Sequence, residues 1–175
     1  ERIRFLGHAQ QGAAIAENVL ERFRFSSLEK EIVRRIIDQH LRPGHLSNAP
    51  QFPTPRAVYR YFRDNPNVGM DTLFISLADH LATRGPTVDN EGWQTHLRVT
   101  EHMLSQWLGE EGMASSPKLI DGNILMNELG LAPGPLVGKL LESVREAQAA
   151  GDVSTEKDAL DLARKELNKT YANQR

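Results

Sequence analysis

The sequence predicts an all-α protein. Apolar residues recur at helical spacing in nearly every segment, no segment shows a convincing alternation of apolar and polar residues, and helix-capping residues separate the apolar runs. The chain has 175 residues with 39% hydrophobic content, so it can bury a core as one compact domain or as one domain with a small appendage.

The N-terminal half is predicted to begin with a helix over residues 8 to 23. A capping box, Ser26 to Glu29, starts a second helix that ends at the Arg-Pro-Gly of residues 42 to 44. A proline-rich loop runs from there to about Phe52. Apolar side chains of the first helix are expected on one broad face: Ala13, Ile15, Ala16, Val19, Leu20 and Phe23.

A third helix is predicted to start at Thr54 and Pro55, which suit the N-cap and N1 positions, and to end before the Asn-Pro-Asn of residues 65–67. The apolar run at 70–82, MDTLFISLADHLA, predicts a central buried helix. Another helix is expected from Asn90 to about Leu108.

Residues 109–116, GEEGMASS, are the best linker candidate, and three short helices should follow as a small separate bundle. The first runs from Asp121 to Gly130, the second from Pro135 to Gly151, and the last is capped by Ser154 or Thr155 and runs into a polar tail at 168–175. We therefore divide the chain into domains 1–112 and 113–175.

Composition excludes several classes of protein. The chain has no cysteine, which rules out a disulfide framework and a thiolate zinc site, and no apolar stretch approaches the length of a membrane span. We expect no membrane partner and a cytoplasmic location. A net charge of -2 argues against bulk attraction to nucleic acid and leaves room for a local basic face. Because the chain begins at Glu1, we expect a piece of a longer protein.

Three side chains on separate predicted helices are candidate metal ligands: His8, His40 and Asp79. Asp79 lies in an apolar run, and a buried carboxylate needs a metal ion, an arginine or a helix N-terminus as its partner. Imidazoles and a carboxylate suit a divalent transition metal. The alternative is that His8 only caps a helix or is a satisfied core group.

Arg56, Arg60 and Arg63 form the clearest basic face, because their spacing places them on one side of the third helix with Tyr59 beside them. Such a stripe can follow phosphates while an aromatic ring stacks on bases. The alternatives are a solvated face or pairing with Asp64 and Asp71. Further positive charge on the first two helices comes from Arg22, Arg24, Arg34 and Arg35, which spacing does not assign to the same surface.

The turn GLAPGPLVGKLL allows two interpretations. Gly134 and Gly138 are four residues apart, so they share a helix face and permit close approach of a neighbouring helix. Alternatively, the helix N-terminus near Pro135, with Lys139 one turn on, cradles an RNA phosphate. The chain has no Gly-x-Ser-x-Gly elbow, no P-loop and no strand-borne carboxylate pair, so we assign no catalytic residue.

Two long segments resemble one family. FLGHAQQGAAIAENVLERFRFSSLEKEIVRRIIDQHLRP with DTLFISLADHLA is similar to the HD-domain region of bacterial CCA-adding tRNA nucleotidyltransferases and poly(A) polymerases. LIDGNILMNELGLAPGPLVGKLLESVREAQAAGDVSTEKDAL resembles the segment that closes many of those proteins, and it is the more specific match.

The resemblance implies an HD-domain-like helical bundle followed by a small C-terminal helical bundle. It implies a part that binds tRNA or other structured RNA and positions it for an N-terminal nucleotidyltransferase head, absent here, which uses magnesium. His8, His40 and Asp79 match the later HD ligand positions, while the His-Asp pair is missing, so we expect no cofactor in this piece, although the parent's HD site could hold another divalent metal. The alternative is a metal-dependent HD phosphohydrolase acting on a phosphomonoester or cyclic nucleotide.

Overall fold

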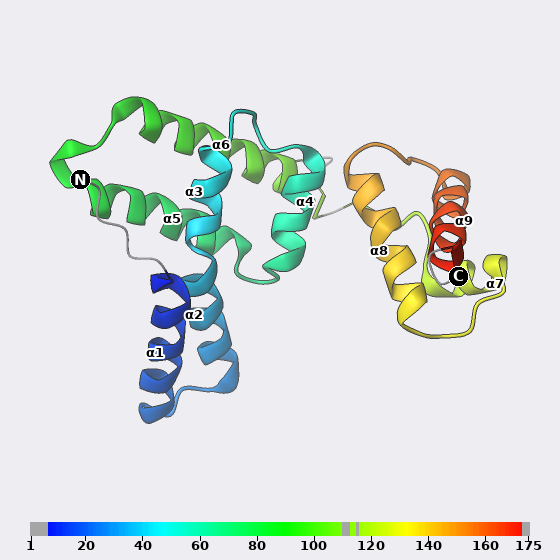
Figure 1. The fold of residues 1–175 in the computed structure, drawn as a ribbon, viewed down its shortest axis with the longest axis horizontal. Helices are drawn as coiled ribbons and strands as arrows, with labels where there is room; N and C mark the ends of the chain where they lie inside the picture. Colours follow the sequence, from blue (N-terminus) through cyan, green and yellow to red (C-terminus); the bar gives the residue numbers. More distant parts are fainter. Residues whose placement is uncertain (1–6, 110–112, 115, 173–175) are drawn as a thin grey trace. The chain divides into compact units, whose positions relative to one another are not determined.

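A computed structural model describes residues 7–109, 113–114 and 116–172. Within these ranges the regular elements are helices and no strand forms, so the predicted all-α fold is confirmed (Figure 1). No helix of this described part has both the length and the apolar character needed to cross a bilayer. The elements are α1 (His8–Arg22), α2 (Ser27–Gln39), α3 (Leu41–Ser47), α4 (Pro55–Asp64), α5 (Gly69–Arg84), the 3-10 turn η1 (Gly85–Thr87), α6 (Asn90–Leu108), α7 (Gly122–Leu129), α8 (Pro135–Ala149) and α9 (Glu156–Ala172).

The chain forms two compact units. The first contains the described residues of 1–53 and 61–105, and the second contains those of 54–60 and 106–175, so the first turns of α4 belong with the C-terminal helices. Part of the predicted linker at 109–116, residues 110–112 and 115, lies outside the described residues. The linker and the domain boundary after residue 112 stay predictions.

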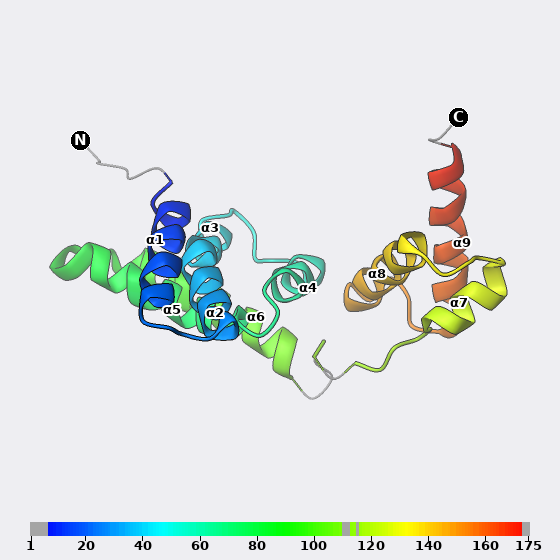
Figure 2. The same cartoon turned by 90° about the horizontal axis from the view of Figure 1, so that it is seen from below.

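In the first unit, α1 and α2 lie side by side as a hairpin (Figures 1 and 2). The predicted capping box is present: the Ser26 hydroxyl accepts from the Glu29 amide at 3.3 Å, and the Glu29 carboxylate accepts from the Ser26 amide at 2.8 Å. These two bonds satisfy backbone donors at the start of α2 and fix where the hairpin turns.

The broad buried face predicted for the first helix is wrong at three positions. Ala9 and Ala13 are buried, whereas Ile15, Val19 and Phe23 are 64%, 41% and 73% exposed. Helix α1 packs chiefly on α2, which covers one side of it and leaves the rest of its apolar stripe in solvent. Apolar periodicity predicted the helix correctly and overestimated how much of it is covered.

The predicted loop is wrong over its first residues, because α2 ends at Gln39 and Arg42-Pro43-Gly44 lies inside the short helix α3, which runs to Ser47. Proline is tolerated in the first turn of a helix, where its missing N–H has no intrahelical partner to lose. Pro43 is buried, and α3 packs against α5. The loop itself is confirmed from Asn48 to Thr54, where no helix forms.

Helix α5 is only partly the central buried helix that its composition predicted. Thr72, Leu73 and Ser76 are buried, while Phe74 and Ile75 are 56% and 45% exposed. The helix is hydrophobic nearly all round, and its neighbours in the described chain cover one face. In the second unit, α7, α8 and α9 form the predicted three-helix bundle around one apolar core of Ile120, Leu125, Val137, Leu140, Val144, Ala159, Ala163 and Leu167.

Candidate nucleic-acid interface and histidine pairs

His8 and His40 come together at the open end of the α1–α2 hairpin. His8 is the first residue of α1, and His40 joins α2 to α3. Their Nε2 atoms lie 3.4 Å apart. His40 Nδ1 contacts the carbonyl oxygen of Ile37, so it carries the proton in that bond and leaves Nε2 facing His8. The structure thus unites two of the three predicted ligands.

This pair fits part of a metal site. Two imidazole nitrogens that bind one tetrahedral zinc ion at about 2.0–2.1 Å lie roughly 3.3–3.4 Å apart. A backbone carbonyl on the other ring nitrogen, as at His40, is how metal-binding histidines are commonly oriented. Over the described residues, no group of three His, Asp or Glu side chains converges tightly enough to hold an ion. Metal binding by His8 and His40 therefore stays a prediction.

Asp79, the third predicted ligand, is half-buried on α5. Its backbone carbonyl accepts a hydrogen bond from the Thr83 hydroxyl at 2.7 Å. The sequence argument assumed an enclosed carboxylate that must have a charged partner, and this side chain instead reaches solvent. Asp79 does not complete a three-residue cluster with His8 and His40 among the described residues.

A second histidine pair, which sequence reasoning missed, joins α5 to α6. His80 and His96 place their Nδ1 atoms 3.2 Å apart, and His96 Nε2 lies 3.4 Å from the Ser76 hydroxyl. His96 is 2% exposed, and the ring of Trp93 lies 5.4 Å from that of His80. The signal available in the sequence was the placement of His80 near the end of one helix and His96 near the start of the next, which an antiparallel helix pair brings together.

Burial keeps this second pair neutral. It lowers the pKa of His96 to about 4, with further contributions from His80 and Arg84. Burial also lowers the pKa of His80, helped by Arg84 and opposed by Asp79 and Asp89. The Nε2 atom of His80 is enclosed without a hydrogen-bond partner in the described part of the chain. In the neutral pair, one Nδ1–H donates a hydrogen bond to the other Nδ1. Protonation of both rings would place two cations in contact.

The arginine stripe of α4 faces acidic side chains of the same unit. The Arg60 guanidinium donates two bonds to the Glu146 carboxylate of α8, with Arg60 Nε 2.9 Å from Glu146 Oε2. Arg56 pairs with Glu146 at 3.6 Å and with Asp152. The two arginines do share one side of the helix, as their spacing predicted. That side faces carboxylates, as the alternative of acidic pairing proposed, but the partners of Arg56 and Arg60 are Glu146 and Asp152, which the sequence analysis did not name.

The remaining members of the stripe are also engaged. Arg63 pairs with its neighbour Asp64 at 2.7 Å, and Arg42 joins the same carboxylate at 3.0 Å. The Tyr59 hydroxyl lies 3.5 Å from the Glu142 carboxylate of α8. Burial raises the pKa of Tyr59, and Glu142 adds to that effect, so the phenol stays protonated. RNA contact by these side chains stays a prediction, and it requires RNA to displace the carboxylates that they now contact.

Lys139 is exposed near the start of α8. Gly134 is the N-cap of this helix, and no side chain caps it. Pro135 has no N–H, and the Val137 amide donates to the Gly134 carbonyl at 3.1 Å. A Cβ atom added at Gly134 or Gly138 would meet no described atom within 4 Å, so close packing of a neighbouring helix on these glycines is the wrong interpretation for the described chain.

The C-terminal half of the chain matches a family model. Residues 98–163, which include α7, α8 and the start of α9, match the family described as tRNA nucleotidyltransferase domain 2. No solved structure was found to match the chain.

Curated relatives match nearly the whole chain. It is 36% identical over 158 residues to a CC-adding tRNA nucleotidyltransferase of Thermus thermophilus, covering 90% of this chain and 33% of that protein. It is 31% identical over 156 residues to an A-adding tRNA nucleotidyltransferase of Deinococcus radiodurans, covering 89% of this chain and 34% of the relative. A CC-adding enzyme of Synechocystis is 29% identical over 157 residues. The chain thus spans about a third of the length of these relatives.

Proposed function

Because this chain belongs to the CCA-adding tRNA nucleotidyltransferase family, we propose that it is the helical, tRNA-binding part of such an enzyme. It holds the RNA in position for a nucleotidyltransferase head that lies outside this sequence. One observation carries the proposal: relatives that add CC or A to tRNA align with about nine-tenths of the chain, across both of its units.

The proposed mechanism is positional. Helix N-termini and cationic side chains hold phosphates, and the RNA is recognised by its shape, because phosphate contacts fix register without reading sequence. The N-terminus of α8, which no side chain caps, and the exposed Lys139 one turn on support this mechanism, since a helix dipole and an ammonium group both favour an anion. Nucleotide transfer needs CTP, ATP and magnesium at the head, and we assign no residue of this chain to that chemistry.

The arginine stripe of α4 can bind RNA only where a phosphate displaces its present acidic partners. Arg56, Tyr59, Arg60 and Arg63 are the predicted RNA contacts, and each has an acidic neighbour in the chain. A phosphate has to displace Glu146 or Asp152 to reach the stripe. The side chains of Arg56 and Arg60 are about half exposed, so RNA phosphates can reach their guanidinium groups, although the Glu146 carboxylate that they share is only 14% exposed.

A second candidate function rests on the His8–His40 pair. The 3.4 Å separation of the two Nε2 atoms favours a shared ion, and further ligands from outside this sequence would complete a phosphohydrolase site. His8 and His40 would then hold an ion that activates water against a phosphomonoester or a cyclic nucleotide, whereas Asp79, the third predicted ligand, forms no three-residue cluster with them in the described structure. Both functions are compatible with one parent protein.

Fluorescence anisotropy of the 175-residue chain with tRNA that lacks its CCA end tests the first proposal. We expect salt-dependent binding that exceeds binding to a DNA duplex of similar charge. Lys139→Gln should weaken it, whereas Lys157→Gln, at the start of α9, serves as a matched control. Equal affinity for both nucleic acids, or no binding, contradicts a tRNA-binding function and directs attention to metal content and phosphatase activity.

A further inference from the structure

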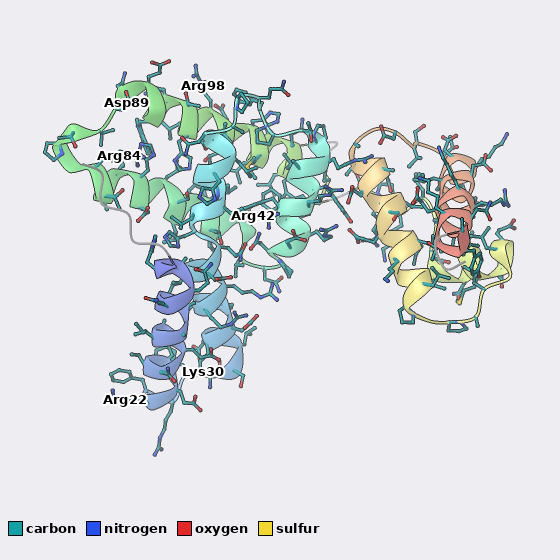
Figure 3. The ribbon with its side chains drawn as sticks, viewed as in Figure 1. Arg22, Lys30, Arg42, Arg84, Asp89 and Arg98 are labelled. Atoms are coloured by element: carbon teal, nitrogen blue, oxygen red, sulfur yellow. The ribbon has the colours of Figure 1, made fainter. Side chains whose placement is uncertain are left out.

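The turn that joins α1 to α2 exposes two aromatic rings that alternate with two arginines. Residues 22–25 read Arg-Phe-Arg-Phe, with Phe23 73% and Phe25 45% exposed. Arg22 and Arg24 are exposed as well, and Figure 3 shows Arg22 at the free end of the hairpin. Large exposed phenyl rings are costly in water, so a surface that holds two of them beside cations suggests a binding partner.

Unlike the arginines of α4, the two arginines of this turn have no acidic partner in the described residues. In the described residues neither Arg22 nor Arg24 forms an ion pair, whereas Arg56 and Arg60 pair with Glu146. The nearby carboxylates have other partners: Glu29 caps α2, and Glu21 lies 3.8 Å from the Lys30 ammonium. An anionic ligand reaches Arg22 and Arg24 without displacing an acidic side chain.

The backbone at Arg24 adds an independent observation. The amide of Phe25 donates to the Leu20 carbonyl at 3.0 Å, and the amide of Arg24 donates to the Glu21 carbonyl at 2.9 Å, which is the Schellman ending of a helix. Arg24 occupies its left-handed position with φ 59°, where glycine is usual. An arginine held there gives up stability, and such strain is typical of functional positions.

From these observations we propose that the turn Arg22–Phe25 is an RNA-binding site for unpaired nucleotides: a base stacks on Phe23, and Arg22 and Arg24 hold the adjoining phosphates. Interleaved aromatic and cationic side chains are the chemistry that binds single-stranded nucleic acid without reading its sequence. Because Arg22 and Arg24 are positively charged and have no acidic partner in the described residues, a polyanion such as RNA is favoured as the occupant over an apolar protein or lipid surface. The inference rests on the proposed tRNA-binding function and adds to it a contact on the first unit.

Substitutions in the full chain test the site, with labelled tRNA that lacks its CCA end and a labelled single-stranded oligouridylate as probes. Phe23→Ala should weaken binding of both probes about tenfold, and Phe23→Trp should preserve it, because stacking needs an aromatic face. Phe74→Ala removes another exposed ring, from α5, and should leave affinity unchanged. Replacing both Arg22 and Arg24 by glutamine should lower the salt slope by about 1.4, at roughly 0.7 for each of the two single-strand phosphate contacts.

Arg24→Gly should change thermal stability and RNA affinity in opposite directions. Glycine suits the left-handed position, so the thermal midpoint should rise while RNA affinity falls. If the chain binds tRNA and Phe23→Ala and Arg24→Gly bind as tightly as the parent, the turn is not an RNA site and the proposed function stands. Absence of any tRNA binding overturns both. RNA affinity unchanged by Phe23→Ala, together with self-association or vesicle binding lost in that variant, identifies the turn as a protein or lipid surface and also overturns the inference.

Discussion

The Nδ1 atoms of His80 and His96 lie 3.2 Å apart where α5 meets α6, and His96 is almost fully buried. Arg84, the last residue of α5, and Asp89, directly before α6, lie on either side of the turn that joins these helices (Figure 3). A buried neutral imidazole in contact with another cannot accept a proton without cost. This relationship makes the stability of the first unit depend on pH.

Acidification should destabilise the chain well above the usual range of carboxylate titration. The pKa of His96 in the fold is about 4, below the ordinary histidine value of 6.5, so the unfolded chain takes up protons first as pH falls. The stabilising contribution is fully present above about pH 6.5 and is lost as pH falls toward 4. Between about pH 7 and pH 4.5 we expect a loss of about 2 kcal/mol in the free energy of unfolding, measured by urea denaturation.

Variants isolate this effect from other titrations. His96→Gln removes the titrating group and should flatten the dependence of the urea midpoint on pH, even if it lowers stability at every pH. His45→Gln changes an exposed histidine on α3 and should leave the dependence as it is. A pH profile of His96→Gln parallel to that of the parent would show that the pair does not govern acid stability.

The capping box makes Ser26 a sensitive position. Ser26→Ala removes the acceptor for the Glu29 amide and the fixed start of α2, and it should lower the free energy of unfolding by about 1 kcal/mol. Ser27→Ala, one residue later, removes no capping bond and should be close to neutral. Thermal melts followed by circular dichroism compare the two, and equal midpoints would contradict the capping role.

Two glycines should respond oppositely to alanine. Gly138 lies inside α8 with open space around its added Cβ, so Gly138→Ala should raise the free energy of unfolding by about 0.5–1 kcal/mol through helix propensity. At Gly69 the Cβ would lie 2.6 Å from the Phe62 ring, so Gly69→Ala should destabilise the first unit. Urea titration measures both. A destabilised Gly138→Ala would restore the close-packing interpretation of residues 134–138.

Local chemistry explains which parts of this fold were predictable. Helix starts depend on side chains next to them in sequence, so the Ser26 cap and the Asp121 cap, which accepts from the Ile124 amide at 2.9 Å, could be predicted without knowing any tertiary contact. The end of the second helix was predicted a few residues too late, because α2 ends at Gln39. The helix α3 that contains Arg42-Pro43 was not predicted, because proline is compatible with a first turn and only packing on α5 reveals that helix.

Long-range pairing explains what was missed at the candidate sites. Helical spacing placed Arg56 and Arg60 on one face, but the acidic partner Glu146 is 86 residues beyond Arg60 in sequence. His80 and His96 meet only because the chain turns back through η1. The His8–His40 contact was expected from family resemblance, and its partners are separated by 32 residues. Charge and periodicity predict which side of a helix is polar and leave open what faces it.

The α4 stripe yields a test that uses its acidic partner. Arg60→Ala should weaken tRNA binding and lower the salt slope by about 1 if the stripe contacts phosphate. Glu146→Gln should strengthen binding, because it removes the carboxylate that competes for Arg56 and Arg60. Arg164→Ala, which removes an arginine of similar exposure that pairs with Asp161 within α9, is the control for loss of positive charge. If Arg60→Ala and Glu146→Gln both leave the affinity unchanged, α4 is outside the RNA-binding surface and its arginines serve only to hold α8.

The His8–His40 pair makes a prediction about zinc. Two imidazoles share the cost of dehydrating an ion less effectively than a full tetrahedral set, so the chain should bind Zn²⁺ weakly. Calorimetric titration near pH 7 should show that His8→Ala and His40→Ala each lose this binding, while His45→Ala keeps it. Asp79→Asn should leave it unchanged, because the described residues hold no three-ligand cluster. Tight binding that Asp79→Asn abolishes would show instead that α5 closes on the pair and that this chain alone provides three ligands of the predicted site.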